Sequence, residues 1–251
     1  MSIFSLEKVN YHLYAGVIVG LFLLISFTGV VYAPLREVTA EITNRFYENF
    51  IPEGENFIEH LEAFFWMCMF TVYGYLFSKS LIINKISSTS LWLLFFVLLG
   101  FVAFGEEISW GQHIFGFRPP EFVENINAQN EFNIHNLNIS AMIGLSSDSF
   151  FYDRLSNITR VLNILFFMIC GIIWFVIPIL KLKGFFSNFK ALACMPMPKK
   201  ETVLFCGVSF FSLRVIDMAF FDTGEIIELT ISLVALMSGL DLLTERRIVL
   251  E

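Results

Sequence analysis

Several stretches of about 20 residues in this chain carry almost no charge, and that length is needed to cross about 30 Å of hydrocarbon. The whole chain of 251 residues is 56% hydrophobic and only 16% charged. Soluble domains are usually about 45–50% apolar and about 25% charged. These features exclude a soluble enzyme and a disordered protein, and they predict an integral membrane protein.

The net charge of −7 excludes the basic surface that nucleic-acid-binding proteins use. The spacing of the four cysteines matches neither a disulfide framework nor a paired CxxC zinc site. We therefore expect no nucleic acid among the partners and no disulfide.

The hydropathy pattern predicts an all-α, polytopic membrane protein that forms a single transmembrane domain over residues 1–251. A multi-pass protein of this kind fits the inner, cytoplasmic membrane of a bacterium. Six membrane-spanning helices are expected, at residues 12–33, 59–79, 89–113, 158–180, 202–222 and 224–244. The loops between them include two outer segments, 34–58 and 114–157, and a basic segment, 181–201.

The distribution of Lys and Arg among the loops predicts the orientation, because cytoplasmic loops carry an excess of these residues. With a cytoplasmic N-terminus, the inner segments hold ten of them and the outer segments four. Both termini are therefore expected in the cytoplasm.

Ionisable residues inside membrane spans are costly and need an explanation. In this chain they are Glu62, Glu106, Glu107, Arg214, Asp217, Glu225, Glu228 and Asp241. The expected topology places all except Asp241 near the outer ends of their helices. His60, His113 and His135 are expected at the same level, so the sequence predicts one acidic, imidazole-containing site in the outer leaflet.

Glu106 and Glu107 are the first candidates for catalysis, together with His113 and His135. On a continuous helix Glu106, Trp110 and His113 would share one face. Two adjacent carboxylates in a low dielectric repel, so a partly protonated carboxyl group suited to general acid–base chemistry is one expectation. The alternative is a structural pairing of both glutamates with Arg214.

Further residues have candidate binding roles, each with a structural alternative. A divalent metal such as zinc would be held by His60, His135, Glu225 and Glu228. Substrate contacts are expected from Trp110, Gln112, Gln129, Asn133 and Arg214. The alternatives are helix-dipole stabilisation by Glu225 and Glu228, pairing of Arg214 with Asp217, and an ordinary polar loop containing the carboxamides.

The pair Glu106-Glu107, followed by histidines on other segments, resembles the CAAX-protease and bacteriocin-processing family of intramembrane glutamate proteases. That family carries EExxxR and then FxxxH, whereas this chain has Gly111 in place of the Arg and the shorter FxxH from Phe132 to His135. The gathering of acids and histidines is also similar to that of membrane hydrolases related to alkaline ceramidases, whose HxxxH element is missing here. The resemblance implies a type of site, and no catalytic role is carried over.

Three functions are compatible with these patterns. The first is an intramembrane hydrolase or transferase that acts on a lipid, a lipid-linked glycan or a membrane peptide in the bilayer. The second is an ion or proton pathway, or an oligomeric sensor subunit with a protein partner, since intramembrane carboxylates also mark ion routes. The third is a scaffold in a homo-oligomer or larger complex.

Overall fold

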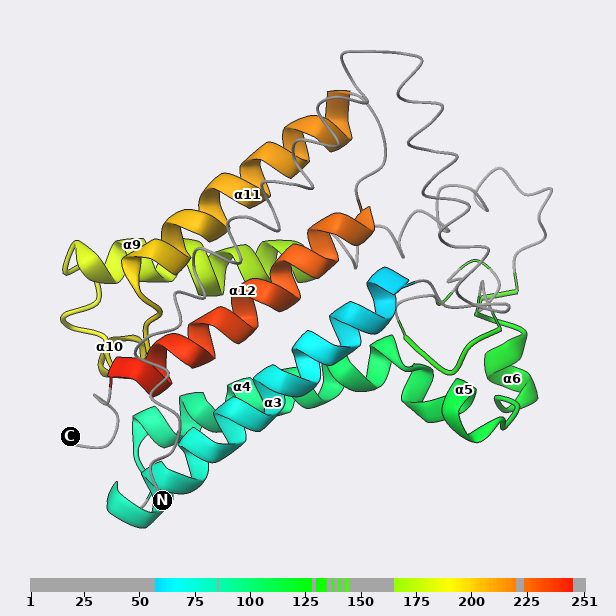
Figure 1. Ribbon diagram of the computed structural model, residues 1–251, viewed down its shortest axis with the longest axis horizontal. Coiled ribbons are helices and arrows are strands. Elements are labelled where there is room, and N and C mark those ends of the chain that lie inside the picture. Colours follow the sequence, from blue (N-terminus) through cyan, green and yellow to red (C-terminus); the bar gives the residue numbers. More distant parts are fainter. Residues whose placement is uncertain are drawn as a thin grey trace.

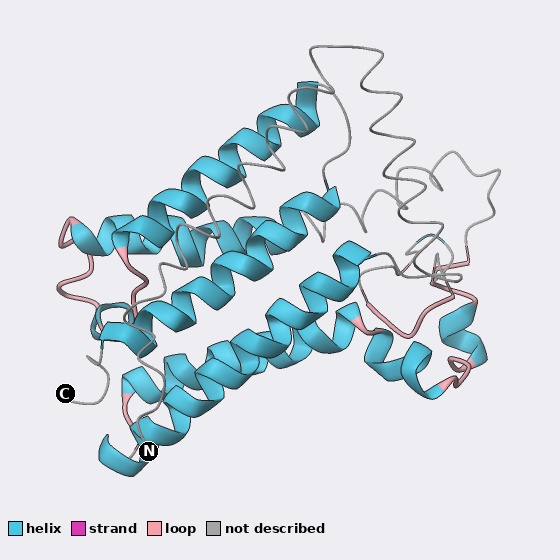
Figure 2. Cartoon of the chain, in the orientation of Figure 1, coloured by secondary structure: helices cyan, strands magenta, loops and turns pink. Residues whose placement is uncertain are grey.

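The computed structural model describes residues 57–84, 86–127, 130–134, 137, 140, 143–144, 165–219 and 224–245. Within these ranges the chain is helical and has no strand, apart from one isolated bridge between Asn127 and Leu137 (Figure 2). The span expected at residues 12–33 and the outer segment 34–58 lie outside the described residues, except for 57 and 58.

Four helices are long and apolar enough to cross a membrane, at Glu59–Ile83, Ser88–Glu107, Leu165–Leu182 and Ile227–Thr244. They correspond to four of the six expected spans, so the described part of the chain is that of an all-helical membrane protein. The fifth expected span, 202–222, overlaps helix α11 (Lys200–Ala219), which is not among the four.

The long helices pack as two sequence-adjacent pairs joined by one sequence-distant contact (Figure 1). Helix α3 (Phe57–Asn84) lies along α4 (Ser88–Glu107), and α12 (Gly224–Glu245) packs against α3 on one side and α11 on the other. The Leu165–Leu182 span contains a π-helical segment, η3 (Ile172–Val176), followed by α9 (Ile177–Leu182), and η3 contacts both α11 and α12. Helix α12 is therefore the centre of the described bundle.

The sequence of α12 reflects this central position. Its span is 72% buried, whereas the spans of α3, α4 and Leu165–Leu182 are 28–33% buried and present apolar side chains outward. Inside the bundle, the Ser238 hydroxyl lies 2.6 Å from the Tyr73 hydroxyl of α3 and accepts a hydrogen bond from Trp174 Nε1 at 3.0 Å. Hydrogen bonds of this kind connect helices that have no hydrophobic driving force between them in lipid.

Asp241, near the C-terminal end of α12, has a structural role. Its Oδ2 accepts hydrogen bonds from the backbone N–H of Lys199, at 2.8 Å, and from the Thr202 hydroxyl, at 2.6 Å. Because the first N–H groups of a helix have no partner within it, this carboxylate stabilises the start of α11. The segment before α11, within the basic stretch 181–201, also forms the short helix α10 (Lys190–Ala193).

The expected helix at residues 89–113 is wrong at its C-terminal end, because α4 ends at Glu107. Ser109, Trp110 and Gly111 have φ values of 46°, 51° and 85°, in a left-handed region that a continuing α-helix does not use. A short 3-10 turn, η2 (Ser109–Gly111), then leads into α5 (Gln112–Phe115) and, after Pro119-Pro120, into α6 (Glu121–Glu124). Glu106, Trp110 and His113 therefore do not share the face of one helix.

Candidate functional site

Three carboxylates from three different helices meet at one end of the bundle. Glu62 of α3, Glu107 of α4 and Glu228 of α12 each offer an oxygen atom, and these oxygens lie within 4.8 Å of one another. Glu62 is 1% exposed, and the other two residues are half-buried. Among the described residues, these glutamates, which we call the carboxylate triad, form the one group of three acidic, His or Cys side chains this close together.

The triad follows from the direction of the helices. Helices α3 and α12 begin at the end of the bundle where α4 finishes, close to α5 (Figure 1). Glu62 lies in the second turn of α3, Glu228 in the second turn of α12, and Glu107 is the last residue of α4. Glu62 and Glu228, which are 166 positions apart in the sequence, thus lie at the same depth in the bundle.

Three carboxylates at this distance need positive charge or protons among them. Two unit charges 4.8 Å apart repel by about 3.5 kcal/mol at an effective dielectric constant of about 20. Burial of Glu62 adds a desolvation cost to its ionised form. A bound metal ion, shared protons or a cationic side chain would each relieve this repulsion, and Arg214 is the sequence-based candidate for the last.

Glu106 is adjacent to the triad but has a different position. Its Oε1 accepts a hydrogen bond from Trp110 Nε1 at 2.7 Å, and its Oε2 accepts one from the backbone N–H of Ile134 at 2.6 Å. The two neighbouring glutamates therefore have different roles: Glu107 joins the triad, while Glu106 attaches the segment 130–134 to the end of α4.

Gln112 attaches the same segment at a second point. Its Oε1 accepts a hydrogen bond from the backbone N–H of Phe132 at 2.7 Å, and its Nε2 donates to the carbonyl of Asn130 at 3.3 Å. Gln112 and Glu106 thus bind alternate backbone N–H groups, those of Phe132 and Ile134. This arrangement resembles the pairing of an extended strand, with side chains in place of the neighbouring backbone.

A network of buried polar side chains stabilises the same segment. Asn133 Nδ2 donates to Glu131 Oε2 at 2.6 Å and to Ser109 Oγ at 3.2 Å, and the Ser109 hydroxyl donates to the same Glu131 oxygen. Asn127 closes the network, since it donates to Asn133 Oδ1 and accepts from the backbone N–H of Glu131. Buried polar groups that satisfy one another in this way make a segment rigid.

The expected substrate-binding residues are thus largely engaged within the protein. Trp110 binds Glu106, Gln112 binds the segment 130–134, and Asn133 is buried in the network. Gln129 lies outside the described residues, as does the side chain of Arg214. The carboxamides of Gln112, Asn127 and Asn133 act here as internal hydrogen-bonding groups.

The expected metal ligands are only partly brought together. Glu228 belongs to the triad, whereas His60 is exposed on α3 and is not a member of that group. His135 and the side chains of His113, Asp217 and Glu225 lie outside the described residues. Glu62 was not assigned a role from the sequence, although its cost as a carboxylate in a membrane span is the signal that identifies it.

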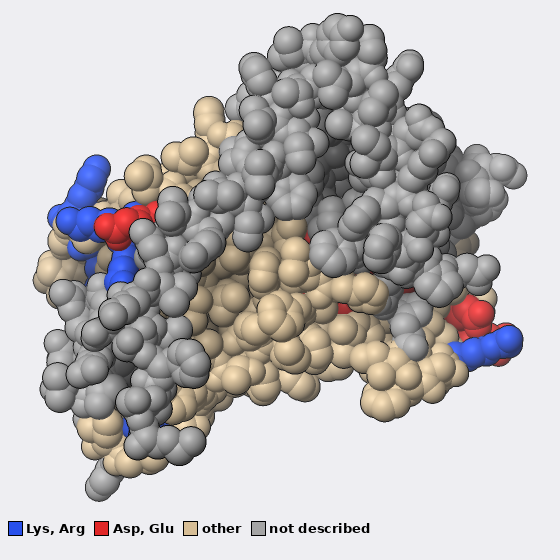
Figure 3. All heavy atoms as spheres, in the orientation of Figure 1, with Lys and Arg blue, Asp and Glu red and all other residues tan. Residues whose placement is uncertain are grey.

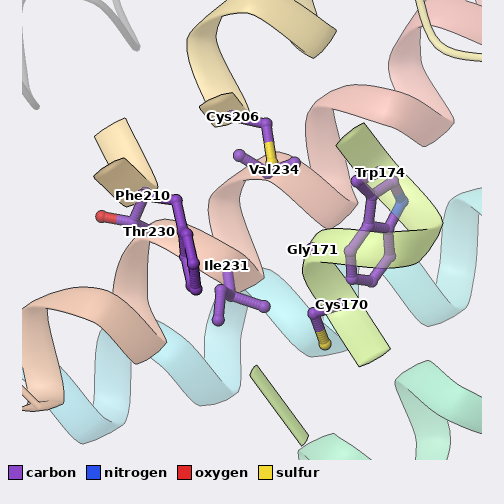
Figure 4. A pocket seen from close by; sticks show the side chains of 8 residues that line it. All are labelled: Cys170, Gly171, Trp174, Cys206, Phe210, Thr230, Ile231 and Val234. Carbon is purple, nitrogen blue, oxygen red and sulfur yellow. The ribbon is translucent and has the colours of Figure 1, made fainter. Parts of the chain in front are cut away.

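An apolar cavity elsewhere in the bundle offers little chemistry. It lies among η3, α11 and α12 and is lined by Cys170, Gly171, Trp174, Cys206, Phe210, Thr230, Ile231 and Val234 (Figure 4). Its polar groups are one hydroxyl, two thiols and the Trp174 indole, with no acid or imidazole. The triad is therefore the stronger candidate for a functional centre.

No protein-family model, curated protein or solved structure matches this chain.

Proposed function

We propose that the protein is a membrane-embedded hydrolase or transferase whose reaction centre is the carboxylate triad. The observation that carries the proposal is the meeting of Glu62, Glu107 and Glu228 from three helices, with Glu62 almost fully buried. Intramembrane carboxylates are expensive and face functional cavities far more often than lipid. A rigid outer segment beside the triad supports a site that holds its geometry while a substrate binds.

The donor set favours a hard divalent cation, such as Mg²⁺, Mn²⁺ or Ca²⁺, over the zinc that the histidines suggested. Carboxylate oxygens suit these ions, whereas imidazole and thiolate favour zinc. An ion equidistant from three oxygens 4.8 Å apart would lie about 2.8 Å from each, and Ca²⁺–oxygen distances are about 2.3–2.6 Å. A small inward movement of the side chains is therefore sufficient for binding.

Each component would have a distinct role in this proposal. A metal ion bound there would lower the pKa of a water molecule or polarise the bond to be cleaved. Glu107, half-buried at the end of α4, would accept the proton of the attacking water or hydroxyl group. His135, which directly follows the Glu106-bound Ile134 in the chain, would transfer protons, and Arg214 would bind an anionic head group.

The same proposal gives an orientation in a bacterial inner membrane. Lysines gather at the end of the bundle opposite to the triad, on α9, α10 and the start of α11 (Figure 3). Arg118 lies between α5 and α6, at the triad end (Figure 1). Because cytoplasmic loops are enriched in such residues, the lysine-rich end would face the cytoplasm. The substrate, a lipid, lipid-linked glycan or membrane peptide, would then reach the triad from the outer leaflet.

Metal analysis of the purified protein tests this proposal. We expect about one Mg²⁺, Mn²⁺ or Ca²⁺ ion per chain after equilibration, and loss of that ion in Glu62→Gln, Glu107→Gln and Glu228→Gln. Glu121→Gln, an exposed glutamate of α6, is the matched control and should retain the ion. Equal metal content in all four folded variants would contradict the proposed centre.

The alternative function is a cation or proton pathway. It is favoured by the same triad together with Asp241, a second buried carboxylate at the other end of α12. Proteoliposomes with a proton or cation gradient distinguish the two functions. Flux that disappears in Glu62→Gln would support the pathway, whereas no flux above that of empty liposomes would support the enzyme.

A further inference from the structure

The segment that follows α4 exposes large apolar side chains, although the sequence places it in an outer loop. Ile114 is 66% exposed, Phe115 79% and Phe122 68%. Water-facing loops rarely gather apolar side chains in this way, and such patches mark contact surfaces. Two polar residues of the neighbouring segment, Glu131 and Asn133, are instead buried.

This surface continues the outward face of α4. Leu91, Leu98 and Val102 are exposed along that helix, at spacings that place them on one side. At the end of the helix the ring of Phe101 contacts that of Trp110 edge-on, with centroids 5.8 Å apart. The exposed apolar surface of α4 therefore continues through the left-handed turn into α5. The contact between Phe101 and Trp110 connects the two parts.

The segment is also attached to the rigid part of the outer structure. The ring of Phe117 lies edge-on to Phe132, with centroids 6.1 Å apart, and the backbone N–H of Phe132 is held by Gln112. Charged side chains, Arg118, Glu121 and Glu124, are exposed on the same segment. Apolar and charged groups side by side are typical of structures that lie in the interface between hydrocarbon and water.

We propose that residues 112–122 rest in the interfacial layer of the lipid bilayer, with Ile114, Phe115 and Phe122 inserted among the upper acyl chains. The bilayer is the occupant of this surface because the surface is continuous with that of the spanning helix α4. Since α5 begins only five residues after Glu107, the triad would then lie near the depth of the lipid head groups. This inference does not depend on the chemistry proposed for the triad.

Lipid-dependent fluorescence quenching tests the proposal. A bimane label would be placed on Phe115→Cys in a Cys68→Ala/Cys194→Ala background, because Cys170 and Cys206 are buried. Leu98→Cys, on the outward face of α4, is the membrane reference, and Lys183→Cys, after α9, is the aqueous reference. In nanodiscs with lipids brominated near the top of the chain, we expect quenching at residue 115 to be at least half of that at residue 98.

Iodide in the aqueous phase completes the experiment. The label at residue 115 should be quenched by iodide several-fold less than the label at residue 183. Strong iodide quenching with no effect of brominated lipid would place the segment in water and overturn the proposal. Protection from both quenchers would mean that protein covers the surface, in a second copy of the chain or a partner, and would also overturn it.

Discussion

Glu106 accepts a hydrogen bond from the backbone N–H of Ile134, with 2.6 Å between Oε2 and the nitrogen. The bond connects the last turn of a membrane-spanning helix to a segment 28 residues away, and the other oxygen of the same carboxylate binds Trp110 Nε1. Because both oxygens of Glu106 are used as acceptors, this residue positions the segment around Ile134. The proton-transfer role expected for the Glu106-Glu107 pair falls to Glu107 in our proposal.

Substitution of Glu106 should loosen the segment around Ile134. Glu106→Ala removes both acceptors, and losing hydrogen bonds to a charged group costs about 1–3 kcal/mol. Hydrogen exchange of the amides of Phe132 and Ile134, measured by mass spectrometry in detergent, should accelerate by about 5- to 100-fold. Glu106→Gln keeps one acceptor oxygen, so its effect should be intermediate.

Glu107→Gln is the control for this measurement. It changes the neighbouring residue but leaves the two hydrogen bonds of Glu106 in place, so exchange in the segment should stay within about two-fold of the wild type. Equal acceleration of exchange in Glu106→Ala and Glu107→Gln would contradict the different roles that we assign to these two residues.

Gly105→Ala should destabilise the end of α4. A Cβ atom at this position would lie 2.9 Å from two ring atoms of Trp110, closer than real contacts allow, and Trp110 is held by Glu106. We expect the melting temperature in detergent to fall by several degrees, because the ring must move and lose its hydrogen bond. Gly74→Ala on α3, where nothing lies within 4 Å of the added carbon, should be neutral or slightly stabilising.

The helical membrane architecture was predictable because long apolar stretches have few alternatives in a bilayer. The end of α4 was not, since Ser109-Trp110-Gly111 contains no proline to end a helix and its left-handed backbone depends on contacts made later in the chain. Glu106 binds Ile134 and Ser109 binds Glu131, and neither pairing has a local signature. Helical spacing therefore extended the helix to residue 113.

The candidate site was predictable in its depth but not in its membership. Counting positions from the helix ends placed Glu62, Glu107 and Glu228 at one level of the membrane. Which carboxylates meet depends on the rotation of each helix about its axis, and packing of α12 against α3 fixes that rotation. Glu106 and Glu107 are adjacent in sequence but about 100° apart around the helix axis, so only Glu107 joins the triad.

Asp241→Ala should weaken the fold without affecting metal binding. The substitution leaves the Lys199 N–H and the Thr202 hydroxyl without their buried acceptor, at a cost of about 1–3 kcal/mol for each group left unsatisfied. Thermal unfolding in detergent should occur at a lower temperature, while the metal content remains that of the wild type. A loss of metal from the folded variant would show that the two ends of α12 are coupled, contrary to the structural role assigned to Asp241.

Removal of one triad carboxylate should have opposite effects on stability with and without divalent ions. In EDTA, Glu62→Gln relieves the repulsion among three carboxylates within 4.8 Å, so its melting temperature should exceed that of the wild type. With a divalent ion at 100 times its dissociation constant, the wild type gains about 2.7 kcal/mol and the variant much less, so the order should reverse. Glu121→Gln should follow the wild type in both conditions. An unchanged order of melting temperatures would mean that another positive charge, rather than a metal ion, balances the triad.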